Sequence, residues 1–97
     1  MRYLRTDDFY HSHKMSEAKA SEARLLKLLG DGNDECGDGK SDMHWEGILA
    51  LDSGECVKVA AWDWKGGMRQ GYGVSIWCDK PEHLHTWKRF LESHPLT

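Results

Sequence analysis

The chain has 97 residues, of which 39% are hydrophobic and 30% charged, and its formal net charge is −3. This length predicts one domain with a core of its own, and the composition excludes an intrinsically disordered protein. Because we find no apolar run long enough to cross a membrane and no signal peptide, we expect a cytoplasmic protein.

Residues 1–14 predict an N-terminal arm rather than a free tail. The arm contains four large apolar residues, Tyr3, Leu4, Phe9 and Tyr10. Such side chains favour burial, so we expect the arm to pack over a face of the sheet. The next residues, 15–29, predict a helix, because Ala, Glu, Lys, Arg and Leu dominate and Gly30 stands where a left-handed C-terminal cap is common.

Residues 30–42 predict an acidic, glycine-rich loop. Its alternating acids and Asp42 at the twelfth position resemble the calcium loop of EF-hand proteins. Cys36 stands where that loop requires glycine, and the residues that follow predict a strand instead of a second helix. We therefore interpret it as a solvated loop and expect no metal site and no cofactor.

Charge is unevenly distributed along the chain. Residues 31–55, which we call the acidic segment, hold eight acids and one base and carry −7, whereas the parts before and after carry +2 each. A net acidic domain without a basic block is a poor candidate for direct nucleic-acid binding. The segment can instead attract a basic protein surface, including one that normally binds nucleic acid. The acids for which we expect this role are Asp31, Asp34, Glu35 and Asp38.

Residues 44–51 predict the first of three antiparallel strands. Asp52 to Gly54 predict a three-residue hairpin loop with the glycine in left-handed conformation. We expect Leu49 and Leu51 to lie on the same face as the valines of the next strand.

Residues 55–79 predict a second hairpin with two distinct faces. Gly66 and Gly67 predict its two-residue turn, which places Val59 opposite Val74. Period-two alternation predicts strands on both sides of this turn, and a slip by one residue would exchange their faces. The face predicted to meet the core carries Val57, Val59, Ala61, Tyr72, Val74 and Ile76.

The opposite face of this hairpin carries three of the five tryptophans, with an arginine able to stack on one ring and glycines beside them. Two interpretations stay open. The rings are covered by the protein's own arm or helices, or they form an exposed patch, since Trp and Arg are enriched at binding hot spots. The candidate binding residues are Trp62, Trp64, Arg69, Tyr72 and Trp77.

Residues 80–93 predict the second helix, with Asp79 as N-cap and Pro81 in its first turn. The expected fold is thus a single α+β domain over residues 1–97, in the order helix, three-stranded antiparallel meander, helix. This order is similar to that of double-stranded-RNA-binding domains. That family has a lysine cluster where this chain has residues 79–83, so we carry no RNA-binding function over.

Signals for catalysis or metal binding are weak. The three cysteines, Cys36, Cys56 and Cys78, cannot all pair, and no CxxC motif is present. His83 and His85 are two positions apart on a helix, so they cannot hold one ion together, although Cys78 and His83 could contribute to a composite zinc site. We find no nucleophile motif and no phosphate-binding loop, and we expect no enzymatic activity.

Two functions of different classes follow. In the first, the protein is a stoichiometric protein-binding module, such as an inhibitor or immunity-type protein of phages and mobile elements that blocks a nucleic-acid-handling protein. The acidic segment supplies the complementarity and the indole rings supply the anchors. In the second, the aromatic face, or a homodimer cleft, binds a nucleotide-like ligand by stacking, with Arg69 or Lys58 meeting a phosphate.

Overall fold

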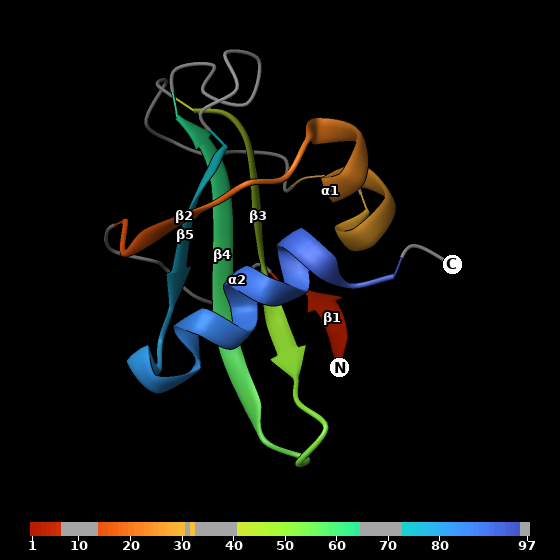
Figure 1. Ribbon diagram of the computed structural model, residues 1–97, viewed down its shortest axis with the longest axis vertical. Helices are drawn as coiled ribbons and strands as arrows, with labels where there is room; N and C mark the ends of the chain where they lie inside the picture. The colour runs from red at the N-terminus through yellow and green to blue at the C-terminus, as the bar shows by residue number, and fades with distance from the viewer. Residues whose placement is uncertain (7–13, 31, 33–40, 65–72, 96–97) are drawn as a thin grey trace.

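The computed structural model describes residues 1–6, 14–30, 32, 41–64 and 73–95, with the backbone alone at 41–43 and 64. The described residues form an α+β domain of one antiparallel sheet and two α-helices (Figure 1). This class is the predicted one. The sheet has five strands, however, and not the three of the predicted meander. No helix of the described part is long and apolar enough to cross a membrane.

The strands are ordered β1-β3-β4-β5-β2, and all neighbours are antiparallel. Their bounds are β1 Arg2–Arg5, β2 Ser16–Ala18, β3 Ser41–Ala50, β4 Cys56–Trp64 and β5 Val74–Cys78. The predicted meander corresponds to β3, β4 and β5. The two additional strands, β1 and β2, come from the N-terminal part of the chain and form the two edges of the sheet.

The first helix, α1 (Glu22–Leu29), is shorter than predicted because residues 16–18 pair with β5 as strand β2. Ser21 begins the helix, and its side-chain oxygen accepts a hydrogen bond from the backbone N–H of Arg24. Gly30 ends it with a φ of 85°, a conformation that costs glycine little. The C-terminal helical region consists of a 3-10 turn, η1 (Pro81–His83), followed by α2 (Leu84–Ser93).

The hairpin loop between β3 and β4 is confirmed. Gly54 has a φ of 93°, and the backbone N–H of Leu51 donates to the carbonyl oxygen of Glu55. Leu49 is fully buried on the valine face, and Leu51 packs against the edge of the core. The local signal of a glycine after two polar residues was therefore sufficient to fix this turn.

The hairpin of β4 and β5 keeps the predicted faces but not the predicted register. Val59 pairs with Cys78 instead of Val74, a displacement of four positions along β5. Side chains alternate with a period of two, so an even displacement leaves each one on its predicted face. The predicted two-residue turn at Gly66 and Gly67 lies outside the described residues.

The hydrophobic core lies between one face of the sheet and the two α-helices. The strands contribute the predicted valine face, together with residues of β2 and β3: Ala18, Trp45, Leu49, Val57, Val59, Ala61, Val74 and Ile76. The helices contribute Leu25, Leu29, Trp87, Phe90 and Leu91. Figure 1 shows both helices on the same side of the sheet.

Two buried tryptophans join the layers through their ring nitrogens. Trp45 on β3 donates to the carbonyl oxygen of Gly30 at 2.9 Å and so satisfies a group at the end of α1. Trp87 on α2 donates to the carbonyl oxygen of Ala60 on the central strand at 3.0 Å. The arm residue Tyr3 covers Gly47, where an added Cβ would lie 2.3 Å from its ring. The arm was predicted to pack over a face of the sheet, but residues 2–5 extend the sheet as an edge strand, and only the side chain of Tyr3 reaches the core.

Candidate functional site

The face of the sheet that points away from the helices is the first candidate site. We call it the outer face and define it by five residues that alternate with core residues along the strands: Leu4, Ile48, Ala60, Trp62 and Trp77. Neither α-helix lies on this side of the sheet (Figure 1). Apolar side chains that gather on one accessible face are typical of interaction surfaces.

Burial divides the outer face into two parts. Trp62 is only 8% exposed and Ala60 is fully buried. Trp77 and Ile48 are half-buried, and Leu4 is 45% exposed. The expectation that Trp62 belongs to an uncovered row of rings is therefore wrong. The apolar side chains that the outer face offers to a partner are those of Leu4, Ile48 and Trp77.

Trp62 lies on the central strand between two buried residues. Its cross-strand neighbours are His44 on β3 and Ser75 on β5, and both are themselves buried. Trp77 pairs with Ala60 and is thus a diagonal neighbour of Trp62, so two of the predicted rings do lie together.

The other predicted binding residues lie outside the part of the chain whose side chains the structure describes. They are Trp64, Arg69, Tyr72, Asp31, Asp34, Glu35 and Asp38. Of the glycines predicted to line a trough beside the rings, Gly73 has a structural role. It has a φ of 90°, and an added Cβ would lie 2.4 Å from the carbonyl oxygen of Ala18 on β2. Gly73 thus allows the close approach of a strand and not of a ligand.

Three acids of the acidic segment have described partners. Glu46 lies 3.0 Å from the ring of His44, which is 4% exposed. Asp52 accepts from the N-terminal amine at 2.6 Å, and this hydrogen bond lowers the pKa of Asp52. Asp52 is nevertheless highly exposed, with 84% of its side chain accessible, so its charge remains available to solvent and to a partner.

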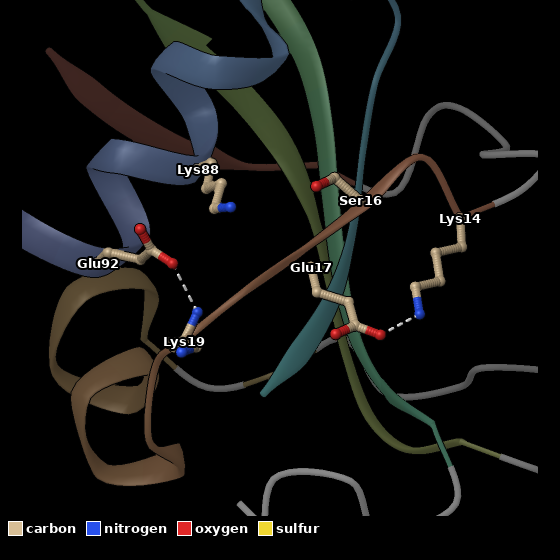
Figure 2. A pocket seen from close by; sticks show the side chains of 6 residues that line it. All are labelled: Lys14, Ser16, Glu17, Lys19, Lys88 and Glu92. Atoms are coloured by element: carbon tan, nitrogen blue, oxygen red, sulfur yellow. Dashed lines mark hydrogen bonds and ion pairs between the residues drawn. The ribbon is translucent and has the colours of Figure 1, made fainter. Parts of the chain in front are cut away.

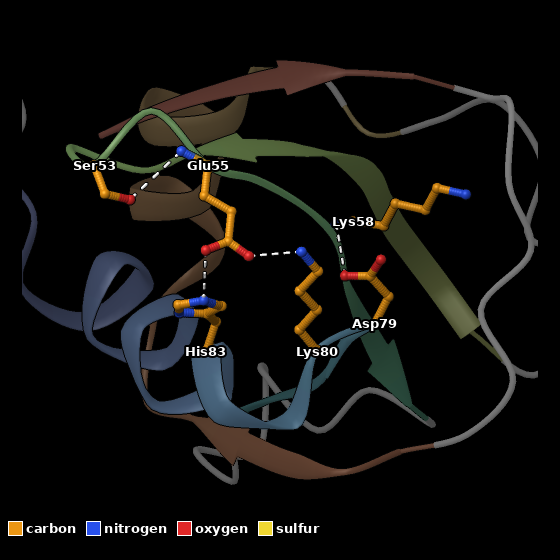
Figure 3. Close-up of polar contacts among 6 residues, drawn as sticks. All are labelled: Ser53, Glu55, Lys58, Asp79, Lys80 and His83. Carbon is orange, nitrogen blue, oxygen red and sulfur yellow. Dashed lines mark hydrogen bonds and ion pairs between the residues drawn. The ribbon is translucent and has the colours of Figure 1, made fainter.

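Glu55 forms the centre of a polar cluster (Figure 3). One carboxylate oxygen accepts from Nζ of Lys80 at 2.6 Å, and the other lies 3.2 Å from Nε2 of His83. The hydrogen bond with Lys80 lowers the pKa of Glu55 and raises that of Lys80. Because both oxygens are engaged, the cluster ties the β3–β4 turn to η1 and does not present a free base for catalysis.

Asp79 does not act as the predicted helix cap. Its carboxylate accepts from the backbone N–H of Lys58 at 3.0 Å, and its own N–H donates to the carbonyl oxygen of Lys58 (Figure 3). Lys80 is the N-cap residue of η1 and makes no side-chain capping bond. A carboxylate that follows a strand can serve either the strand or the next helix, and here it closes the ladder between β4 and β5.

The two described cysteines lie on opposite sides of the sheet and are both free thiols. Cys56 is exposed, whereas Cys78 is 1% exposed and its burial raises the pKa of its thiol. In the part of the chain that is described, no group of three or more His, Cys, Asp or Glu side chains could hold a metal ion. The composite zinc site considered for Cys78 and His83 therefore finds no third ligand there.

Among the hollows that described residues line, two are relevant to ligand binding. The larger, of about 410 Å³, lies beside the edge strand β2 and is lined by Lys14, Ser16, Glu17, Lys19, Lys88 and Glu92 (Figure 2). The smaller, of about 360 Å³, lies near β1 and the end of α2 and is lined by Met1, Arg2, Tyr3, Lys27, Leu28, Phe90, His94 and Pro95. Neither hollow is lined by a tryptophan, so neither is a Trp-lined cleft of the kind that nucleotide stacking requires.

No local pattern in the sequence predicts the β2 hollow, because its six residues come from two segments more than 60 positions apart that meet only when the sheet is complete. Lys14 and Lys19 flank what was predicted as the start of a helix. The pairing of β2 with β5 brings them toward Lys88 and Glu92 on α2.

No family model, curated protein or solved structure matches the chain.

Proposed function

We propose that the protein is a small binding module that docks through its outer face on a basic surface of another protein. The observation that carries this proposal is the placement of both helices on one side of the sheet, with Leu4, Ile48 and Trp77 accessible to different degrees on the other. Leu4 and Ile48 are cross-strand partners and so form a contiguous apolar pair. A central apolar contact with a charged surround is the usual anatomy of a protein interface.

Charge complementarity supports a basic partner. The acidic segment carries −7, and its acids with described side chains, Glu46, Asp52 and Glu55, lie on β3 and on the β3–β4 turn. Acids placed around a docking face raise the rate of association with a positively charged protein and disfavour acidic ones. A surface that normally binds nucleic acid has the required charge, so the class of function that we propose is a stoichiometric inhibitor of a nucleic-acid-handling protein.

Two leucines of similar exposure allow a matched test of the docking face. Leu4 lies on the outer face and is 45% exposed, whereas Leu26 lies on α1 and is 37% exposed. We expect Leu4→Glu to weaken partner binding at least about tenfold, and Leu26→Glu to leave it unchanged. The measurement is affinity capture from the native cell with each variant as bait, followed by binding kinetics with the purified partner. If the wild type, Leu4→Glu and Leu26→Glu bind the partner equally, the outer face is rejected as the docking surface.

The electrostatic part of the proposal has its own test. Replacing Asp31, Asp34, Glu35 and Asp38 by their amides should slow association with the partner and flatten its dependence on salt. Replacing the exposed acids Glu22 and Glu82, which lie outside the acidic segment, gives the control. An association rate that both sets change equally, or that neither changes, would contradict steering by the acidic segment.

The second candidate, a nucleotide-like ligand bound by a Trp-lined face or homodimer cleft, has less support, since Trp62 is buried and no tryptophan lines the two hollows. Titration of tryptophan fluorescence with nucleotides separates the two proposals. A saturable change would favour ligand binding, and its absence would leave the docking proposal. Sedimentation of the free protein tests for the homodimer.

A further inference from the structure

The hollow beside β2 contains two hydrogen-bond donors that face each other. In Figure 2 the hydroxyl of Ser16 and the ammonium of Lys88 turn toward one another across the space between β2 and α2. Within the described part of the chain, neither group makes a hydrogen bond or an ion pair. The hydroxyl oxygen of Ser16 could itself accept from the ammonium, but the pair would still hold further N–H and O–H donors, which an anionic acceptor between them would use.

The two acids of the hollow are already engaged. Glu17 is held by the ammonium of Lys14, whose hydrogen bond lowers the pKa of the Glu17 carboxyl. Glu92 accepts a hydrogen bond of 2.8 Å from the backbone N–H of Lys19. Three lysines and two glutamates give the hollow a net positive charge within a protein whose overall charge is −3. The local field at Lys88 and Ser16 therefore favours an anion.

The chemistry of the walls restricts the kind of anion. All six lining residues are polar or charged and none is aromatic, so no ring is available to stack on a nucleobase. A lysine ammonium binds phosphate as a compact point charge and does not demand the planar, bidentate geometry of a carboxylate–arginine pair. The volume of about 410 Å³ is sufficient for a group larger than a single phosphate.

We propose that the hollow between β2 and α2 binds a small, non-aromatic phosphate compound, with Lys88 and Ser16 as its central donors and Lys14 and Lys19 at its sides. This site is separate from the outer face and does not depend on the proposed docking function. It also gives the lysines at an exposed sheet edge a role in addition to preventing the pairing of that edge with other strands.

The test uses the full chain at low salt and three probes: inorganic phosphate, pyrophosphate and glycerol phosphate. We expect saturable binding, with pyrophosphate binding most tightly. Binding is measured by calorimetry or by the amide chemical shifts of residues 14–19 and 84–93. Binding of glycerol phosphate as tight as that of pyrophosphate would assign the site to phosphate esters, and weaker binding would assign it to inorganic polyphosphate. Both results support a phosphate site.

Two variants that change the charge of the hollow in opposite directions make the test specific. Lys88→Gln should weaken binding about two- to fivefold, the effect of one exposed ion pair. Glu17→Gln releases Lys14 and should strengthen binding by a similar factor. The controls are Lys27→Gln and Glu22→Gln on α1, which change the net charge by the same amounts outside the hollow. The proposal is overturned if each variant matches its control, or if none of the probes binds saturably.

Discussion

The ring nitrogen of Trp87 donates a hydrogen bond of 3.0 Å to the carbonyl oxygen of Ala60 in the middle of the central strand. Trp87 is fully buried, and its ring stacks on Tyr3 and Phe90 with centroid distances of 6.0 and 5.9 Å. A single side chain thus connects α2 to β4 through a polar contact and to β1 through an aromatic one. Trp87 therefore links the helical layer to two strands of the sheet.

Replacing Trp87 by phenylalanine should lower the free energy of unfolding by about 1–3 kcal/mol, because the buried acceptor at Ala60 loses this donor. Replacement by alanine should cost about 3–5 kcal/mol, since the ring contacts are lost as well. Urea unfolding followed by circular dichroism measures both values. A Trp87→Phe variant as stable as the wild type would show that the hydrogen bond contributes nothing to the fold.

Trp62 and Trp77 should differ in their effect on stability although they are neighbours on the outer face. Trp62 is 8% exposed, so Trp62→Ala should reduce the free energy of unfolding by about 3–5 kcal/mol. Trp77 is half-buried, so Trp77→Ala should reduce the free energy of unfolding clearly less than Trp62→Ala does. Chemical denaturation of both variants checks this order. If both variants lose the same free energy of unfolding, the difference in burial does not distinguish a tryptophan that stabilises the fold from one that is available for binding.

Glu55 should make stability depend on acid pH. Lys80 lowers the pKa of Glu55 in the folded chain, so the carboxylate stabilises the fold above its unfolded pKa and this contribution disappears as the pH falls through the folded pKa. We expect the wild type to lose stability below about pH 4.3 more steeply than Glu55→Gln. Melting temperatures measured across this range check the expectation, with Glu22→Gln as the control. Parallel profiles for wild type and Glu55→Gln would contradict it.

The two described cysteines should react with thiol reagents at very different rates. Cys56 is exposed, whereas the burial of Cys78 blocks access and raises its pKa, so that less of it is thiolate at a given pH. At mildly alkaline pH we expect alkylation of Cys56 within the native protein and protection of Cys78, measured by peptide mass spectrometry. In urea both should react. Rapid native labelling of Cys78 would mean that β5 opens readily.

The sequence predicted those features of the fold that depend on local patterns. Glycine and polar residues defined the turn at Gly54, and alternation assigned Val57 and Val59 to the core face correctly. The predicted register of β4 and β5 was displaced by four positions because it was inferred from a turn at Gly66 and Gly67 alone. An even displacement keeps every side chain on its face, so the alternation pattern could not reveal the difference.

The features of the fold that could not be predicted from the sequence depend on pairing between distant segments. Residues 16–18 have helix-forming neighbours, yet they pair with β5 because Ala18 and Gly73 permit a close approach of the two backbones. The candidate site was affected in the same way. Trp62 on β4 and Trp77 on β5 both lie on inner strands yet differ in burial, so strand order alone does not predict which indole is accessible. The docking and phosphate proposals therefore rest on three-dimensional placement.

Both edge strands lie within the first eighteen residues, and their partners β3 and β5 follow much later in the chain. During synthesis, residues 2–5 have no partner until β3 is made, and residues 16–18 have none until β5 is made. The sheet can therefore be completed only at a late stage, through contacts between distant positions. Slow maturation and sensitivity to proteases in the nascent chain are the consequences of this order of assembly.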